Sequence, residues 1–226
     1  PSCYAQPAQS PCDTAPGLNL VDTLEGKGLT WTALMQSMPS AGFLGPRYPA
    51  SGPTLYAQKH NPFVYFNSVA SNPVRLAKIV PLTDLSLSQT VAHLPNFTFI
   101  VPDQCNDMHG TSTCSDFDGL LKAGDAMVKK LTFAVLNSPS FTRKSALFIV
   151  WDEDDYSSNL GCCDSLPSLG GGHTLALVMT KKTNPRRSAV PINHYSLLRT
   201  IEEGFGLPYL GNSGDPINVP SMFPLL

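Results

Sequence analysis

A short apolar segment followed at once by four acidic residues is the feature that most constrains the fold of this chain. The segment runs from Ala146 to Trp151 and is rich in β-branched and aromatic residues. We therefore predict a strand that is buried on both faces, as in a parallel sheet. The acids, Asp152 to Asp155, would then lie beyond the carboxyl end of that strand, where ligands bind in open α/β sheets.

These acids have two interpretations. Carboxylates crowded at one strand end repel each other unless a cation neutralises them, which favours a metal site. A solvated acidic loop has the same sequence pattern. The pattern alone leaves both open.

The rest of the chain alternates predicted strands and helices. Apolar runs predict further strands at residues 29–36, 96–101 and 174–179, and helical spacing of apolar residues predicts helices at 18–27 and 117–137. A short helix within 71–80 is predicted from Asn72 as its cap and Pro73 in its first turn, and further helices are predicted at 86–93 and 195–205. Residues 1–17 are predicted to be a loop, and residues 39–53 are too rich in Pro, Gly and Ser to be regular. This alternation predicts α/β layering in a single domain, with a core over about 18–211 and a tail over 212–226.

The composition excludes some classes of function. The chain has 226 residues, 14% of them charged, and a formal net charge of −2. No field is therefore present to capture nucleic acid or an anionic membrane. No apolar run approaches the roughly 20 residues that span a bilayer. The chain begins Pro1-Ser2-Cys3 without a Met, which we interpret as a cut from something longer.

Six cysteines form an even set, which favours disulfides over a zinc site. Short loops close readily into disulfides, whereas no pair here has the roughly two-to-four-residue spacing of structural zinc sites. The candidates are Cys3, Cys12, Cys105, Cys114, Cys162 and Cys163. Disulfides imply an oxidising compartment, so we expect a secreted or extracytoplasmic protein, in a periplasm or at a cell surface.

Several polar side chains form a set suited to a divalent cation and an anionic group such as phosphate. The candidates are His60 and Asn61 in an upstream loop, Asp107 and His109 after the strand at 96–101, Asp152 and Glu153 after the strand at 146–151, and His194 before the last helix.

Structural alternatives exist for these residues. Asp107 lies between two cysteines, where turn-forming residues are ordinary. His60 could pack against Phe63, Tyr65 or Phe66. Asn193 could simply cap the helix that His194 precedes.

Several segments together, in order, resemble a family of bacterial and fungal phosphoesterases that includes non-specific phospholipases C and certain acid phosphatases, within the alkaline phosphatase-like superfamily. The segments are NLVDTLE at 19–25, KHNPFVYF at 59–66, LPNFTFIVP at 94–102 with NDMH at 106–109, AGD at 123–125, LFIVWDE at 147–153, and NHYSLLRTIE at 193–202 with FGLP at 205–208. The resemblance implies a doubly wound α/β fold with a mostly parallel sheet and helices on both faces. It also implies hydrolysis of phosphate esters.

The same resemblance implies roles for the candidate residues. Asp152 and Glu153 would ligate one divalent metal ion, whose identity stays open. His109 and His60 would donate to phosphate oxygens or protonate the leaving group. The implied substrate-binding residues are Asp107, Asn61 and His194.

The chain also departs from the family pattern. Family members begin with a strand followed by Glu-Asn, which ligate the metal, and then a Ser or Thr nucleophile; neither is present here, and Gly110 stands where an acid is common. We therefore expect the C-terminal portion of such a domain, incomplete at its N-terminus and inactive alone. Its N-terminal half would be either a separate segment to which this chain is held or an unseen part of the protein.

One alternative is a non-catalytic remnant that acts as a secreted binding or surface protein. Another is a sulfatase or phosphotransferase of the same superfamily, which would need a second metal and more His ligands. Whether the substrate is a monoester, a diester or a phospholipid is open.

Overall fold

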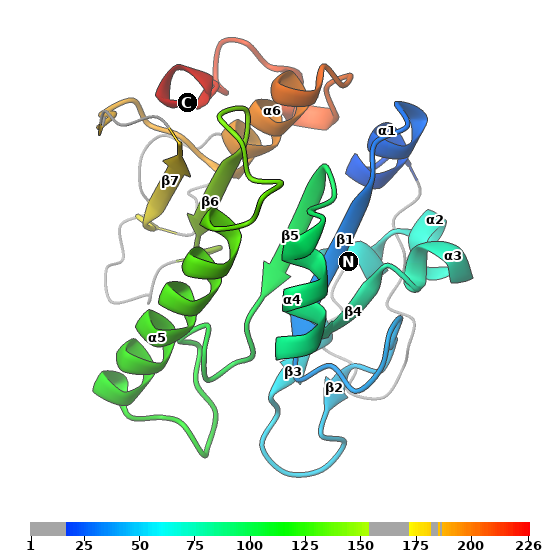
Figure 1. Ribbon diagram of the computed structural model, residues 1–226, viewed down its shortest axis with the longest axis vertical. Coiled ribbons are helices and arrows are strands. Elements are labelled where there is room, and N and C mark those ends of the chain that lie inside the picture. The colour runs from blue at the N-terminus through cyan, green and yellow to red at the C-terminus, as the bar shows by residue number, and fades with distance from the viewer. Residues whose placement is uncertain (1–16, 154–171, 182–184, 186) are drawn as a thin grey trace. The chain divides into compact units, whose positions relative to one another are not determined.

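The computed structural model describes residues 17–153, 172–181, 185 and 187–226 of the chain (Figure 1). The chain divides into two compact units, Pro1–Ser140 and Phe141–Leu226. The first unit holds a parallel sheet flanked by helices, and the second holds an antiparallel strand pair and a helix of 12 residues. This is the mixed α/β architecture that the alternation of strands and helices predicts.

Three parallel strands form the sheet of the first unit, in the order β4, β1, β5. β1 spans Trp31–Gln36, β4 spans Ile79–Leu82 and β5 spans Phe97–Val101. The central strand, β1, has a hydrogen-bonded neighbour on both edges, and its residues Ala33 and Leu34 are fully buried. The core of this unit therefore forms around β1.

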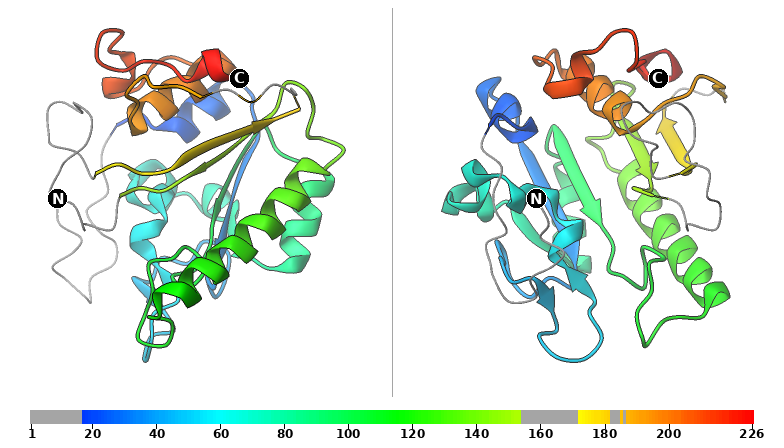
Figure 2. Two further views of the ribbon diagram at one scale, coloured as in Figure 1. Left: turned by 90° about the vertical axis from the view of Figure 1, so that its left-hand side faces the viewer. Right: turned by 180° about the vertical axis from the view of Figure 1, so that it is seen from behind.

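Helices lie on both faces of this sheet. α4 (Asp84–Ala92) lies in front of the strands in Figure 1, whereas α2 (Asn67–Ala70) and α3 (Pro73–Leu76) lie on the opposite side in the views of Figure 2. α5 (Phe117–Leu136) contacts α4, and Lys130 of α5 pairs with Asp84. Helices on both faces are compatible with a doubly wound fold.

The remaining elements of the first unit are short. They are α1 (Leu20–Gly26), the antiparallel pair β2 (Arg47–Tyr48) and β3 (Tyr56–Ala57), and the 3₁₀ turns η1 (Gln58–His60) and η2 (Pro62–Tyr65). Trp31 stacks on Phe63 with ring centroids 5.2 Å apart, and Phe63 meets Phe99 edge-on at 5.4 Å. Phe63 thus belongs to the core.

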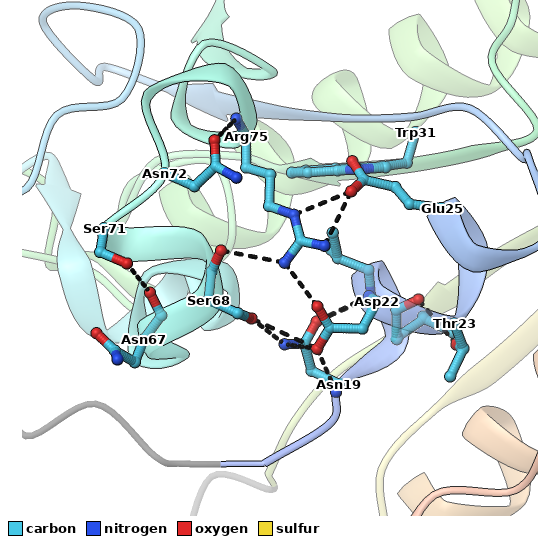
Figure 3. Close-up of polar contacts among 12 residues, drawn as sticks. Asn19, Asp22, Thr23, Glu25, Trp31, Asn67, Ser68, Ser71, Asn72 and Arg75 are labelled. Atoms are coloured by element: carbon cyan, nitrogen blue, oxygen red, sulfur yellow. Dashed lines mark hydrogen bonds and ion pairs between the residues drawn. The ribbon is translucent and has the colours of Figure 1, made fainter.

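A network of charged side chains joins α1 to the segment that leads into β4 (Figure 3). Arg75 Nη1 lies 2.6 Å from Asp22 Oδ1, and Arg75 Nη2 lies 2.9 Å from Glu25 Oε2. Lys78 Nζ and Trp31 Nε1 donate to the other oxygen of Glu25 at 2.7 and 2.9 Å. Partial burial alone would raise the pKa of Glu25, but the hydrogen bonds from Lys78, Trp31 and Arg75 outweigh burial and lower this pKa to about 2.

The second unit is built from two strands and a helix. β6 (Ala146–Val150) pairs antiparallel with β7 (Ala176–Thr180). α6 (His194–Phe205) ends at Gly206, whose φ of 62° is the left-handed conformation that closes many helices. The 3₁₀ turns η3 (Gly211–Gly214) and η4 (Phe223–Leu225) follow.

Most predicted elements are confirmed, with small shifts at their ends. The helices predicted at 18–27, 86–93, 117–137 and 195–205 correspond to α1, α4, α5 and α6, and the strands predicted at 29–36, 96–101, 146–151 and 174–179 correspond to β1, β5, β6 and β7. These segments combine a clear apolar period with capping or turn residues, which fixes their type.

Two expectations are wrong. The strand at 146–151 was expected to be buried and parallel, yet β6 pairs antiparallel with β7 and Val150 is 40% exposed. An apolar run identifies a strand but not the direction of its partner. The irregular stretch at 39–53 contains the two-residue strand β2. The short helix predicted within 71–80 is confirmed as α3, capped by Asn72, and the β-branched Ile79 and Val80 that follow it join β4 beside Pro81.

Among the described residues, no helix combines the length and the apolar character that crossing a membrane requires.

Candidate functional site

The carboxyl ends of β1 and β5 lie side by side, and polar residues that follow the two strands form hydrogen bonds with one another there. Met35 of β1 is paired with Val101 of β5, so the residues that follow each strand are also neighbours. Gln36 Oε1 accepts the backbone N–H of Asp103 at 3.0 Å, and Ser37 donates its hydroxyl to Asp103 Oδ2 at 2.7 Å. Ser37 has a φ of 59°, which turns the chain sharply at the strand end.

Asp103 is the central acceptor of the loop after β5. Its side chain is buried, with the residue 7% exposed, and Oδ1 accepts the backbone N–H groups of Cys105 and Asn106, both at 3.2 Å. The Asn106 amide also donates to Asp103 Oδ1 and to Gln36 Oε1, both at 3.1 Å. A buried carboxylate is stable only when such donors surround it, so Asp103 fixes the path of this loop.

A disulfide closes the same loop. Cys105 and Cys114, two of the six disulfide candidates, are bonded to each other, with their Cα atoms 5.7 Å apart. The other candidates, Cys3, Cys12, Cys162 and Cys163, lie outside the described residues, as does almost all of the loop predicted at 1–17.

Gly110 explains one departure from the family pattern. Its φ is 84°, and a Cβ there would lie 3.0 Å from the Cys114 carbonyl oxygen and 3.1 Å from a Leu120 methyl carbon. An acidic side chain at this position would be strained in this loop, whereas glycine fits.

Asp107, Met108 and His109 form a tight turn inside the disulfide loop. The His109 N–H donates to Asp107 Oδ1 at 2.8 Å, and Met108 has a φ of 74°. A non-glycine residue in this left-handed region costs on the order of 1–3 kcal/mol and persists only where its surroundings enforce it.

His60 and Asp107 are brought together, as the family resemblance implies. His60 Nδ1 lies 3.2 Å from Asp107 Oδ2, and both side chains are 19% exposed. The Asp107 carboxylate thus lies within ion-pair distance of the Nδ1 side of the His60 ring.

His109 lies beside His60, with ring centroids 5.5 Å apart. Its Nδ1 lies 3.0 Å from the Gly110 carbonyl oxygen, and its Nε2 lies 3.2 Å from Lys59 Nζ. A carbonyl only accepts and an ammonium only donates, so these partners assign the neutral tautomer with the hydrogen on Nδ1. Lys59 and His109 are both exposed. The cluster of Lys59, His60, Asp107 and His109 therefore presents an ammonium and two imidazoles to an anion.

Asn61 lies beneath this cluster and is fully buried. Its Nδ2 donates to the Tyr56 hydroxyl at 3.2 Å, while its Oδ1 has no hydrogen-bond partner in the described part of the chain. Burial raises the pKa of Tyr56, and the bond from Asn61 opposes this. A small pocket, with room for about one water molecule, is lined by Tyr56, His60, Gln36 and the end of β5.

In the second unit, Asp152 and Glu153 are exposed and lie just after β6, separated from the strand by Trp151. His194, the first residue of α6, has its Nε2 2.7 Å from the Asp152 carbonyl oxygen, so this nitrogen carries a hydrogen. Asn193 caps α6, as the structural alternative predicted, by accepting the Ser196 N–H at 3.1 Å. His194 thus lies next to an acid, although its bond is to the backbone.

The donor chemistry of Asp152 and Glu153 fits part of a metal site. Carboxylate oxygens suit hard or borderline divalent cations, but protein sites for such ions use more than two ligands. Among the described residues, no group of three or more His, Cys, Asp or Glu side chains is arranged to hold a metal ion.

Sequence reasoning assigned no role to Lys59 or Asp103. The signal for Asp103 was present, because an acid soon after a buried strand is also the pattern that drew attention to Asp152. Lys59 had no such signal, since its relation to His109 depends on a contact across 50 positions of the chain.

Comparison with known proteins identifies relatives of this chain. A family model described as the phosphoesterase family matches residues 2–208. The chain is 31% identical over 192 residues to the phosphate-repressible acid phosphatase of Penicillium chrysogenum, covering 85% of this chain and 43% of that protein. It is 31% identical over 194 residues to the phosphatidylinositol-3-phosphatase of Mycobacterium tuberculosis, covering 85% and 54%.

A probable acid phosphatase of Kluyveromyces lactis is 27% identical over 205 residues, which cover 89% of this chain and 45% of that protein. The chain thus spans about half the length of the relatives it matches.

Proposed function

Because the chain belongs to the phosphoesterase family, we propose that it is part of an enzyme that hydrolyses phosphate esters. The observation that carries this proposal is the cluster of Lys59, His60, Asp107 and His109 at the end of the parallel sheet. An ammonium and two imidazoles that converge on one exposed spot suit the charge of a phosphate group.

The residues of this cluster have distinct roles in the proposed reaction. Lys59 binds a phosphate oxygen, and in doing so releases Nε2 of His109, to which it donates in the structure. His60 is oriented by Asp107 through Nδ1, so its Nε2 gives a proton to the leaving group or takes one from water. Asn61 supports the cluster from below and keeps Tyr56 in place.

We further propose that Asp152 and Glu153 are part of the ligand set of one divalent metal ion. The support is their chemistry and their position just after β6, where His194 binds the Asp152 carbonyl. Such an ion would neutralise phosphate oxygens and lower the pKa of a hydroxyl nucleophile. The remaining ligands and a Ser or Thr nucleophile would come from an N-terminal half in an alkaline phosphatase-like fold. The greater length of the relatives is consistent with this.

For the substrate class we propose phosphate monoesters, with a phosphatase rather than a phospholipase C activity. The support is that three relatives carry the names acid phosphatase and phosphatidylinositol-3-phosphatase. An extracytoplasmic location is supported by the Cys105–Cys114 disulfide, since such bonds persist in oxidising compartments.

The test is the substitution Asp152→Asn in the full-length protein, assayed with a chromogenic phosphate monoester. Loss of a metal ligand should lower kcat/KM by roughly 10³-fold, equivalent to about 4 kcal/mol of transition-state stabilisation. Asp118→Asn, at an exposed acid in the first turn of α5, is the matched control and should retain activity. Unchanged turnover in Asp152→Asn would remove Asp152 from the metal, and an inactive wild type would favour the non-catalytic alternative.

A further inference from the structure

Met108 is the strained centre of the Asp107–Met108–His109 turn. Its φ of 74° is unfavourable for a long side chain. The hydrogen bond from the His109 N–H to Asp107 closes the turn but does not involve the Met108 side chain. Some other contact must therefore hold Met108 in this conformation.

That contact is with Gly124 in the middle of α5. A Cβ built on Gly124 would lie 2.1 Å from Met108 Cε, 2.7 Å from Cγ and 3.2 Å from Sδ. The Met108 side chain thus occupies the volume that any other residue at position 124 would fill. Both the terminal methyl and the Cγ are too close, so Met108 would have to leave its present position rather than rotate its end alone.

Glycine inside a helix is itself unfavourable, because it adds backbone entropy to the unfolded chain. α5 is 20 residues long and carries Gly124 at a buried position near its middle. Gly204 in α6 offers a comparison, since a Cβ there would meet only a Phe223 carbon, at 3.9 Å. Gly124, which is unfavourable inside a helix, therefore contacts Met108, whose positive φ is unfavourable in the turn.

We propose that Gly124 is a positioning residue for the candidate site. By leaving room for Met108 it holds the turn in which Asp107 faces His60 and His109 faces Lys59. The positioning role of Gly124 gives the Ala-Gly-Asp segment at 123–125 a function in the fold. Only the expected effect on catalysis rests on the proposed function.

The first experiment is Gly124→Ala in the full-length protein. We expect kcat/KM for a chromogenic phosphate monoester to fall by about 10- to 100-fold, because small displacements of catalytic groups have effects of this size. The far-UV circular dichroism spectrum should not change. Gly204→Ala is the matched helical control and should keep kcat/KM within about twofold of wild type.

A double-mutant cycle then separates the contact from general damage to the helix. In a Met108→Ala background the new methyl group has no thioether to displace, so Gly124→Ala should change kcat/KM by less than about twofold. An equal loss in both backgrounds would overturn the proposal.

The ring nitrogen signals of His109, measured by ¹⁵N NMR and assigned with His109→Gln, give a readout that does not need turnover. Gly124→Ala should shift these signals away from the Nδ1–H tautomer pattern, and Gly204→Ala should not. Unchanged His109 signals and unchanged kcat/KM in Gly124→Ala would overturn the proposal. A wild type that hydrolyses no phosphate ester, but whose His109 signals respond as expected, would overturn the proposed function and leave the positioning role intact.

Discussion

The loop after β5 and the loop after β6 both bring acids to a strand end, but in different environments. Asp103 is 7% exposed and accepts hydrogen bonds from Ser37, Cys105 and Asn106. Asp152 and Glu153 are exposed. A buried carboxylate with several donors holds its own loop in place, whereas the exposed pair lies at the surface of its unit. Acids that follow a strand therefore stabilise a loop in the first unit and, we propose, bind a metal ion in the second.

Removing Asp103 and Asp152 one at a time should give the largest difference in the free energy of unfolding. Asp103→Ala leaves several partly buried donors without this acceptor and should lower the free energy of unfolding by about 3 kcal/mol. Asp152→Ala should change it by less than about 0.5 kcal/mol, because the side chain is exposed. Urea titration followed by tryptophan fluorescence measures both. Equal stability of the two variants would show that the loops do not differ as described.

The sequence predicted the elements of the fold better than their pairing. The strands at 29–36, 96–101 and 146–151 were recognisable from apolar runs, because burial requires such residues. The antiparallel pairing of β6 was not, since pairing direction depends on contacts between distant segments. β4 was missed because a four-residue strand that contains Pro81 has too little pattern of its own.

The candidate site was predictable to a similar extent. His60 and Asp107 were predicted from their motifs. The close approach of His60 Nδ1 to Asp107 Oδ2 depends on the folded chain and cannot be predicted from either motif. Gly124 belongs to the AGD segment at 123–125 that resembles the family, but the segment alone does not explain why this residue is glycine. That reason, the side chain of Met108, lies 16 positions away and cannot be read from either segment alone.

Acids in the helices also differ in their environments, beginning with Glu25 of α1. Hydrogen bonds from Lys78, Trp31 and Arg75 lower its pKa from 4.5 to about 2. Glu25 therefore adds stability above about pH 4.5, and this contribution is lost as the pH falls through about 2. The side chain is 26% exposed, so solvent screening limits the effect to about 2 kcal/mol.

The test compares unfolding free energies of wild type and Glu25→Gln across this range. The variant should be less stable at neutral pH, and the two curves should converge as the pH approaches about 2. Asp84→Asn is the control, because the Asp84–Lys130 pair is exposed and should contribute less than about 1 kcal/mol. A constant difference between wild type and Glu25→Gln at all pH values would contradict the charge network as its cause.

Glu202 of α6 shows the opposite behaviour and the smallest expected effect. It is fully buried; Oε1 accepts the Leu210 N–H at 2.9 Å, and Oε2 has no hydrogen-bond partner in the described residues. Burial raises the pKa of Glu202 above 4.5, with Ser213, Leu210 and Arg199 opposing and the neighbouring Glu203 adding to the rise. The neutral acid is thus favoured in the folded state. Stability from this group is present below pH 4.5 and is lost as the pH rises through the pKa of the folded state.

Glu202→Gln keeps the acceptor for Leu210 and cannot ionise. It should match wild type in acid and exceed it near neutral pH by on the order of 1 kcal/mol, measured by urea titration at each pH. Glu203→Gln is the matched control, because the hydrogen bond from Ser221 and the contacts of Arg199 and Tyr209 lower the pKa of Glu203. That variant should be less stable than wild type near neutral pH. Parallel curves for wild type and Glu202→Gln would mean that burial does not raise the pKa of this carboxyl.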